Sequence, residues 1–379
     1  MRKVLVLALV LPIKCGASDY PVCKRPCVIE DVDFSNPAQA IQHSRYEMVL
    51  GDLGNPVPER LPLPKVGYAP AILQKYTSVV IDSKGKETYR ARADDISEVN
   101  ECISSKQRIC TLPAHGRTFE SGDVMTLEFD LQYQSAYGLA RFVAVSFLPK
   151  LHTRVVLRNF NGSYLASGAV VKKDGASIVF EASGDAATAG SLIASEVPSW
   201  QYVAEKWPAT ANYHAVDDVA KEIFREVGRK DEAIRIAREW VSKNITYQKR
   251  WLTIADLWSP PDLSGVLASR KADCKGMVTL LEALLANQGI RSEVVLTRLD
   301  SENKKLYLFD PGIPMPGYFD HVLIYVPDLK QYFDATVRAD QLDVEITEYM
   351  SFGLNTKTGE LSCFQASDCK GVARYRLPQ

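Results

Sequence analysis

The pattern of hydrophobic and polar residues changes its period about halfway along the chain. Between about 69 and 205, apolar and polar residues alternate in short runs, and Leu127, Phe129 and Leu131 mark the clearest of them. A period of two is typical of half-buried β-strands, and turns such as Asn161-Gly162 separate the runs. The expected strands are 76–82, 88–93, 124–133, 142–147, 153–160, 164–172 and 177–182. Many short strands at this spacing predict an antiparallel β-sandwich.

The period becomes helical after a linker at 206–213. Apolar residues between 216 and 227 recur every three or four positions, and Gly228 is the expected end of this helix. Asp231 is the expected cap of a second helix, and the proline-containing stretch 259–262 opens a short third one. We expect these helices to pack against a further helix that carries a cysteine.

That cysteine-bearing helix has the most regular pattern in the chain. Asp273 is its expected N-cap and Gly289 its expected stop. Cys274 then lies on the first turn, where unpaired N–H groups and the helix dipole favour the thiolate form of a cysteine. This position is suitable for a nucleophilic cysteine. A strand is expected after the helix, at 293–299. The residues of the single apolar face are Met277, Leu280, Leu281, Leu284 and Leu285.

Two later β segments carry a histidine and an aspartate. A strand is expected at 319–326 with His321 near its start, and the next strand, 331–336, contains Asp334. A turn of a few residues within 327–330 would pair the two strands as a hairpin and make His321 and Asp334 cross-strand neighbours. The carboxylate could then orient the imidazole beside the thiol of Cys274. These residues together predict acyl-transfer chemistry.

The segments DCKGMVTLLEALLANQGIRSEVVL, FDHVLIYV and FDAT resemble the three blocks of the transglutaminase-like superfamily. The resemblance covers roughly 216–343 and implies a papain-like α+β core in which Cys274, His321 and Asp334 are catalytic. Two positions depart from the family pattern. Ala272 stands where the family often has glycine, and Ala335 stands where it often has proline. Neither departure removes a catalytic group.

The upstream region resembles a bacterial arrangement in which an uncharacterised β-rich domain of the DUF3857 kind precedes such a core, and PSWQ at 198–201 is part of this likeness. The leader is expected to be irregular, with one helical turn near 38–45, because it is rich in proline. The expected layout is a signal peptide at 1–17, a proline-rich leader arm at 18–65, a β-sandwich domain at 66–205, a transglutaminase-like core at 213–350, and a C-terminal disulfide loop and strand at 351–379.

Acyl transfer also needs hydrogen-bond donors for the developing oxyanion. The backbone N–H of Cys274 is one candidate. The resemblance implies a second donor from an indole or amide side chain upstream of the cysteine. Trp251 is the preferred candidate, and Trp258 and Gln248 are the alternatives. The tryptophans can equally pack in the core or line a groove.

Composition and charge limit the possible partners. The chain has 379 residues and a formal net charge of −1. This length fits two domains with a substantial core, and the balanced charge does not indicate a nucleic-acid partner. The sequence contains no EF-hand loop and its histidines are scattered, so we expect no metal and no cofactor. The oligomeric state is not indicated.

The first residues predict export. Met1-Arg2-Lys3 is a basic start, 4–11 is a short apolar run, and Cys15-Gly16-Ala17 places small residues before a cleavage site at Ser18. The run is too short to span a bilayer, and no other stretch approaches the roughly 18 apolar residues needed. A periplasmic or secreted location is therefore expected. Lipidation at Cys15 is the alternative, although the preceding residues make a poor lipobox.

Cysteine spacing is consistent with an oxidising compartment. Cys15 is removed with the signal peptide, Cys274 has no near neighbour, and the other cysteines fall into close pairs. Three local disulfides and one free thiol is the simplest assignment, although spacing alone does not prove connectivity. The expected pairs are Cys23 with Cys27, Cys102 with Cys110, and Cys363 with Cys369.

The leading hypothesis is an exported cysteine-dependent acyl-transfer enzyme acting on proteins or peptides. Its thioester on Cys274 would pass to an amine, which gives cross-linking, or to water, which gives amide or peptide hydrolysis. The alternative is a non-catalytic envelope protein that keeps the same core as a peptide-binding scaffold. The presence of Cys274, His321 and Asp334 together favours the enzyme, because a scaffold needs none of them.

Overall fold

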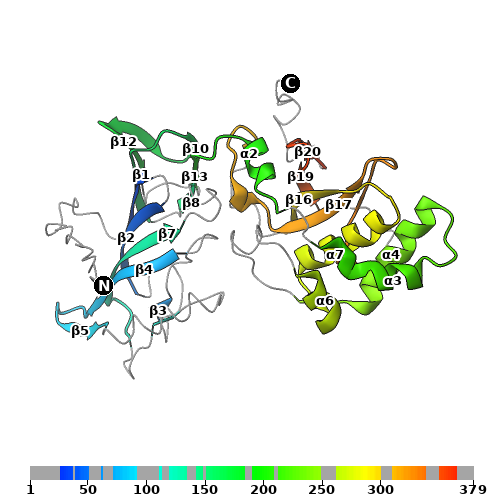
Figure 1. Ribbon diagram of the computed structural model, residues 1–379. Helices are drawn as coiled ribbons and strands as arrows, with labels where there is room; N and C mark the ends of the chain where they lie inside the picture. Colours follow the sequence, from blue (N-terminus) through cyan, green and yellow to red (C-terminus); the bar gives the residue numbers. More distant parts are fainter. Residues whose placement is uncertain are drawn as a thin grey trace, which may run out of the picture.

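The computed structural model describes residues 26–36, 39–50, 61–62, 71–91, 111–112, 119–134, 142–147, 151–183, 190–208, 212–248, 262–299, 310–338 and 350–364. In this part of the chain the first half is built from strands and the second half combines helices with a smaller sheet, so the fold is mixed α+β with a large share of β-structure. Figure 1 shows the two halves side by side, with a short helix between them.

The first half contains a large twisted sheet with the strand order β11-β12-β9-β1-β2-β7-β4-β5. All neighbours in it are antiparallel except β1 and β9, which run parallel. The strands are β1 (Cys27–Asn36), β2 (Gln39–Val49), β4 (Ala71–Ile81), β5 (Glu87–Arg90), β7 (Val124–Gln134), β9 (His152–Arg158), β11 (Val170–Asp174) and β12 (Ser177–Ala182).

Two smaller sheets accompany the large one. The first has the order β10-β13-β8, and the second pairs β3 with β6. The single strand predicted at 164–172 is two strands, because Gly168 adopts a left-handed backbone with φ of 71° between them and the chain passes from one sheet to another. The predicted β-rich content is confirmed, whereas the expected purely antiparallel pairing is not, because β1 and β9 run parallel, and the sandwich arrangement stays a prediction. The strands are β10 (Ser163–Ser167), β13 (Gly190–Ser195), β8 (Phe142–Phe147), β3 (Leu61–Pro62) and β6 (Thr111–Leu112).

The expected irregular leader arm with a helical turn near 38–45 is wrong where the structure describes it. Strands β1 and β2 lie in the middle of the large sheet, and Pro26 and Pro37 flank β1 without interrupting it. The alternating pattern of these strands is hard to recognise because Glu30 and Ser44 stand where apolar residues would be expected, yet both are buried. Because of these buried polar side chains, the sequence pattern did not predict the two central strands.

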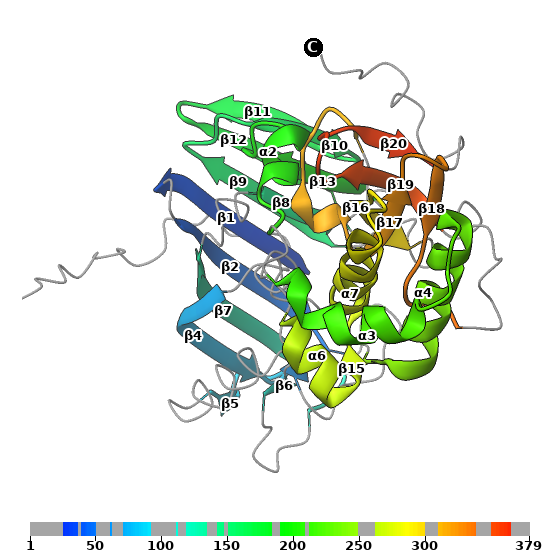
Figure 2. The same ribbon diagram turned by 45° about the vertical axis from the view of Figure 1, so that its right-hand side comes forward.

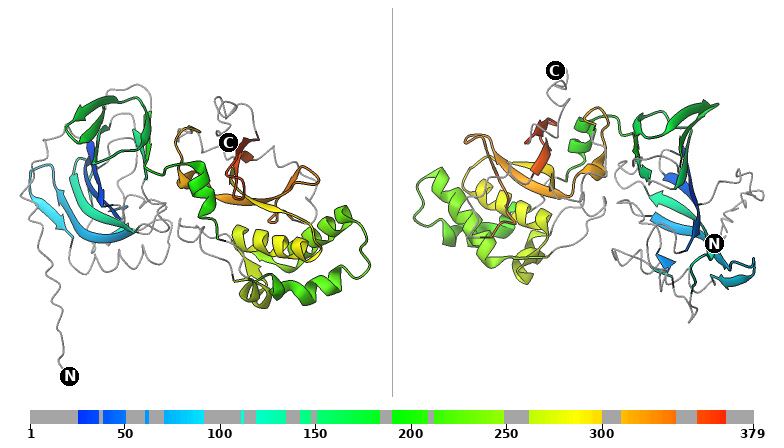
Figure 3. Two further views of the ribbon diagram at one scale, coloured as in Figure 1. Left: turned by 45° about the horizontal axis from the view of Figure 1, so that its top comes forward. Right: turned by 180° about the vertical axis from the view of Figure 1, so that it is seen from behind.

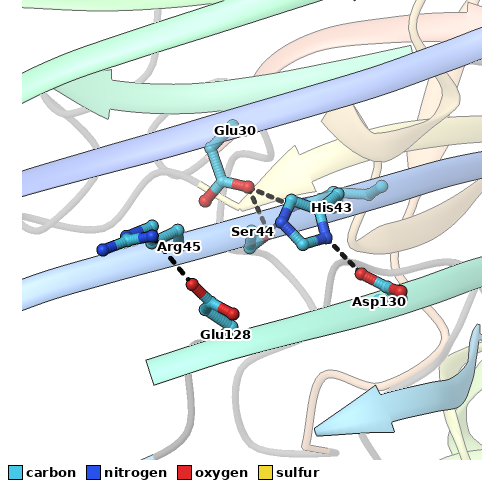
Figure 4. Close-up of polar contacts among 7 residues, drawn as sticks. Glu30, His43, Ser44, Arg45, Glu128 and Asp130 are labelled. Atoms are coloured by element: carbon cyan, nitrogen blue, oxygen red, sulfur yellow. Dashed lines mark hydrogen bonds and ion pairs between the residues drawn. The ribbon is translucent and has the colours of Figure 1, made fainter. Parts of the chain in front are cut away.

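Glu30 is a buried carboxyl group, 4% exposed, that accepts hydrogen bonds from Gln42, Ser44 and Tyr46 on the neighbouring strand. Burial raises the pKa of Glu30, and the hydrogen bonds from the three donors partly oppose this shift. His43 pairs with Asp130, whereas the adjacent Ser44 is directed to Glu30 (Figure 4). Successive strand residues point to opposite faces, so this cluster does not assemble a serine, a histidine and an acid into one site.

The second half is built around a five-stranded antiparallel sheet with the order β18-β17-β16-β19-β20. The sequence ends the core at 350, but β19 pairs with β16 in the middle of this sheet, so the core extends to at least 363. The last part of the expected C-terminal disulfide loop and strand, from 365 to 379, lies outside the described residues. The strands are β16 (Glu293–Leu299), β17 (His321–Val326), β18 (Gln331–Phe333), β19 (Met350–Asn355) and β20 (Leu361–Cys363).

Helix α7 (Cys274–Asn287) is the central helix of this half. It contacts β17 on one side and the helices α3, α4 and α6 on others (Figure 2). All its residues from Cys274 to Leu281 are buried, in agreement with the predicted apolar face. In the described part of the chain no helix has the length and hydropathy of a membrane span. The other helices are α2 (Trp200–Glu205), α3 (Asp217–Ile223), α4 (Lys230–Asn244) and α6 (Leu263–Ser269), with the 3-10 turns η2 (Tyr213–Val216) and η4 (Pro316–Tyr318).

Two helix boundaries differ from their predictions, and the first is the end of α3, which stops at Ile223 rather than continuing to Gly228. In the second, Arg229 rather than Asp231 is the N-cap of α4, and Asp231 lies in the first turn. Asp231 still stabilises the helix from this position, because an acidic side chain in the first turn interacts favourably with the helix dipole.

The buried carboxyl group of Glu30 generates a stability prediction. Because its folded pKa is raised above the ordinary 4.5, its contribution to stability is full below pH 4.5 and is lost as the pH rises through the folded pKa. Glu30→Gln should therefore become more stable relative to the wild type as the pH is raised from 4.5 to 8, measured by thermal unfolding.

The control for this experiment is an exposed glutamate with the opposite shift. The Arg90 guanidinium lowers the pKa of Glu87, so Glu87→Gln should not gain stability with rising pH. Glu30→Leu should lose about 1–3 kcal/mol, because Gln42, Ser44 and Tyr46 then lose their acceptor. An equal loss for Glu30→Gln at every pH would contradict the raised pKa.

Candidate active site

Cys274 is held at the first position of α7 by the cap residue before it. Asp273 has an extended backbone, with φ of −83° and ψ of −177°, and its Oδ1 accepts the N–H of Gly276 at 2.9 Å. This is the predicted N-cap. Gly276 allows the first turn to lie against the incoming strand, because a Cβ there would come within 3.0 Å of the Ala272 Cβ. Cys274 is a free thiol and is 3% exposed.

His321 begins β17, the strand next to β16. It pairs with Thr297, and the N–H of the preceding Asp320 donates to the Thr297 carbonyl at 3.1 Å. Strand β17 continues through a turn at 327–330 into β18, which is the predicted hairpin. Ile324 is opposite Phe333 in this hairpin, so Asp334, the next residue, lies diagonally across from His321 rather than directly opposite it.

The diagonal placement brings the two side chains together. His321 Nε2 lies 2.9 Å from Asp334 Oδ2, and the two residues are 2% and 3% exposed. The other carboxylate oxygen, Oδ1, accepts the backbone N–H of Thr336 at 2.8 Å and its hydroxyl at 2.7 Å. Both oxygens of Asp334 are therefore engaged, and the carboxylate is fixed in the orientation that holds the imidazole.

The electrostatic balance at His321 is set by two opposing effects. Burial alone lowers the pKa of a histidine, but the charge and hydrogen bond of Asp334, together with the neighbouring Cys274, raise the pKa of His321 to about 10. For Asp334, burial acts to raise the pKa, and the interaction with His321 outweighs it and lowers the pKa. At neutral pH the pair is therefore an imidazolium and a carboxylate.

The second ring nitrogen of His321 is available to the cysteine. Among the described residues, Nδ1 is buried and makes no hydrogen bond of regular geometry, while the thiol of Cys274 is close enough to raise the pKa of the ring. Helix α7 packs directly on β17. The structure thus brings Cys274, His321 and Asp334 together, with the histidine between the other two.

Tyr247 is a further residue at this site, and the sequence did not identify it. It ends the short strand β14 (Thr246–Tyr247), which pairs in parallel with β15 (Lys271–Ala272) directly before Cys274. Burial and the charges of Cys274 and Asp334 raise the pKa of Tyr247 to about 12, so its hydroxyl stays a neutral donor. Tyr247 is 42% exposed, in contrast to the buried triad. The sequence signal that could have identified Tyr247 was the strand-like stretch that follows α4.

The other predicted site residues are placed as follows. Trp251 and Trp258 lie outside the described residues. Gln248 is partly buried, and its backbone N–H donates to the Ala272 carbonyl at 2.7 Å, which places it next to the cap of α7. The N–H of Cys274 belongs to the first helical turn and has no partner within the helix, so it can donate to an oxyanion.

The described residues also bear on the cysteines and on metals. Cys27 and Cys363 are each disulfide-bonded, whereas their expected partners, Cys23 and Cys369, and the pair Cys102–Cys110 lie outside the described residues. The pairings therefore stay predictions. Within the described ranges no group of three or more histidine, cysteine, aspartate or glutamate side chains is arranged to hold a metal ion.

Comparisons with known proteins agree with the geometry of the second half. Residues 217–335 match the family model of the transglutaminase-like superfamily. No curated protein sequence matches the chain. The structure is similar to that of a protease candidate from Parabacteroides distasonis, with a TM-score of 0.61 and 13% identity over 87% of this chain and 69% of that one. This likeness concerns the fold alone.

A second solved structure is more distant. It is a cysteine protease candidate from Cytophaga hutchinsonii, with a TM-score of 0.24 and 10% identity over 52% of this chain and 75% of that one. This similarity is too low to support an argument.

The family-model match and the first solved structure together indicate a mixed α+β fold with a transglutaminase-like core at 217–335. The DUF3857 assignment of the upstream region stays a prediction.

The role of Asp334 can be tested on His321 directly. In Asp334→Asn the charge that offsets burial is absent, so the pKa of His321 should fall from about 10 to below its ordinary 6.5. Titration of the ring by nuclear magnetic resonance measures this, with Asp320→Asn, which changes the exposed residue beside the histidine, as the matched control. A high pKa of His321 that survives in Asp334→Asn would show that another group holds the imidazolium.

Proposed function

We propose that the protein is a cysteine-dependent acyl-transfer enzyme in which Cys274 is the nucleophile. The observation that carries the proposal is the placement of a free, buried thiol at the first turn of α7 beside a buried His321–Asp334 pair. A thiol, an imidazole and a carboxylate in this order are the groups that acyl transfer through a thioester requires.

The proposed reaction begins with the proton of Cys274 on His321. The thiolate sulfur attacks the carbonyl carbon of a carboxamide or peptide, and a C–S bond forms while the carbonyl oxygen becomes an oxyanion. His321 then donates its proton from Nδ1 to the leaving nitrogen, the C–N bond breaks, and a thioester remains on Cys274. An amine or water attacks the thioester, its proton passes to His321, and the sulfur leaves. Asp334 holds the imidazole throughout.

The oxyanion needs donors that are aimed at it before the reaction. The N–H of Cys274 is the first donor in this proposal. The hydroxyl of Tyr247 is the proposed second donor, because Tyr247 pairs with Ala272 on the strand that leads to Cys274 and is open to solvent. Trp251 is the donor that the sequence predicted, so the two residues are alternative candidates for one role.

Proteins or peptides are the proposed substrates, and the protease candidate with a similar fold supports this class. Whether an amine or water takes the acyl group is decided by which acceptor reaches the thioester. The proposed location is outside the cytoplasm, and the disulfide bonds of Cys27 and Cys363 support it, because disulfides persist in oxidising compartments.

Thiol labelling tests the proposal without knowledge of the substrate. At pH 6 iodoacetamide should modify Cys274 rapidly, and His321→Ala should slow this by about 100-fold, since an ordinary thiol with a pKa near 8.5 is less than about 1% thiolate at that pH. Asp320→Asn is the control and should label like the wild type. Slow labelling that does not depend on His321 would contradict the enzyme and favour a peptide-binding scaffold.

Single substitutions distinguish the two oxyanion candidates. Removal of one oxyanion donor typically costs about 100- to 1000-fold in kcat. We expect Tyr247→Phe to lower kcat to this extent on a glutamine-containing peptide with an amine acceptor or water, while the labelling rate of Cys274 stays near the wild-type value. Trp251→Phe should change kcat much less. The reverse ranking would assign the role to Trp251.

A further inference from the structure

The segment 310–320 leads directly into His321, and we call it the histidine segment. It has no regular strand, and only the 3-10 turn η4 gives it helical structure. Internal bonds shape it: the backbone N–H of Gly312 donates to Asp310 Oδ1 at 2.7 Å, and that of Ile313 donates to the Asp310 carbonyl at 3.0 Å. These bonds do not attach the segment to the rest of the protein.

Two side chains from the junction of the two halves attach it, Ser195 at the end of β13 and Trp200 at the start of α2. The hydroxyl of Ser195 donates to the Pro314 carbonyl at 2.5 Å, and the indole N–H of Trp200 donates to the Pro311 carbonyl at 2.6 Å. The Ser195 Oγ also accepts the N–H of Val197 at 3.1 Å, so its own proton is directed to Pro314. Ser195 and Trp200 are 1% and 5% exposed, and water does not compete with these bonds.

Aromatic packing adds a second connection between Trp200 and the histidine segment. The Trp200 ring centroid lies 5.8 Å from that of Phe319 and 6.3 Å from that of Tyr318. Both of these rings also pack edge-on against Phe352 in β19. Phe319 is two residues before His321, so Trp200 and Phe352 confine the backbone at the point where the histidine strand begins.

Both attaching residues lie upstream of the matched region 217–335. Ser195 is the last residue of β13 in the β-rich half, and Trp200 is the first residue of α2, which is capped by the Ser199 side chain. Helix α2 lies at the junction of the two halves in both views of Figure 3. The junction of the two halves is therefore part of the packing around the histidine segment.

We propose that Ser195 and Trp200 are positioning residues that set His321 relative to Cys274, so that the β-rich half is a structural component of the active site. This inference rests on the proposed function. The thiol and the imidazole belong to separate elements, α7 and β17, so their separation depends on how these two elements are held against each other. A displacement of about 1 Å in such an arrangement can cost about 100-fold in rate. The two hydrogen bonds and the Trp200 ring oppose that displacement.

The test uses variants that remove one connection at a time. Trp200→Phe keeps an aromatic ring but loses the N–H that holds Pro311. Ser195→Ala loses the hydroxyl that holds Pro314. The matched controls are Trp240→Phe in α4 and Ser191→Ala in the same strand as Ser195. The ring of Trp240 lies under Arg270 and Ser191 bonds to Ser167, so these described contacts are outside the histidine segment.

The readout is the iodoacetamide labelling rate of Cys274 against pH. In both variants the labelling rate of Cys274 should fall by about 10- to 100-fold at pH 6 and change little at pH 9, because a displaced imidazolium no longer stabilises the thiolate. The controls should follow the wild type. In a His321→Ala background, Trp200→Phe should have no further effect, since it acts through the histidine. Melting temperatures report folding, and Ser195→Ala carries the test if Trp200→Phe does not fold.

Each outcome has a separate meaning. If both variants keep the wild-type pH profile, or if Trp200→Phe slows labelling equally without His321, the positioning role is wrong. If the wild type itself labels slowly and without dependence on His321, the proposed function fails first. A His321-dependent wild type with unaffected junction variants overturns this inference alone.

Discussion

The buried contact between His321 and Asp334 is the interaction on which the account of this protein depends. Burial on its own would leave a histidine neutral and would disfavour a charged aspartate, and each group is charged because the other is 2.9 Å away. Thr336 holds the remaining carboxylate oxygen, and the hairpin of β17 and β18 brings the two residues within reach. The imidazolium of His321 is therefore held as a fixed positive charge beside the one free thiol of the described residues.

The two sides of the site are built by different means. Helix α7 places Cys274 through a local device, the Asp273 cap, and through a face that is buried along most of its length. The sheet places His321 through strand pairing, and the segment before it is attached by Ser195 and Trp200 from the junction of the two halves. Cys274, His321 and Asp334 therefore all lie within the transglutaminase-like core at 217–335, whereas the segment before His321 also bonds to residues outside that core.

Local signals explain what could be predicted. The Asp273 cap, the apolar face of α7, the left-handed Gly289 with φ of 65° and the β17–β18 hairpin all depend on residues close in sequence. Strands β1 and β2 were missed because Glu30 and Ser44 break the alternation, although each finds its partner on a neighbouring strand. The pairing of β19 with β16 and the bond from Trp200 to Pro311 join residues far apart in the chain, so no local pattern reveals them.

The central claim is that His321 keeps Cys274 ionised, and the most direct measurement is the ultraviolet absorbance of the thiolate near neutral pH. The account predicts an absorbance difference between the wild type and Cys274→Ser that persists into the acid range and disappears in His321→Ala. A difference that appears only at the alkaline pH of an ordinary thiol, and equally with and without His321, would contradict it.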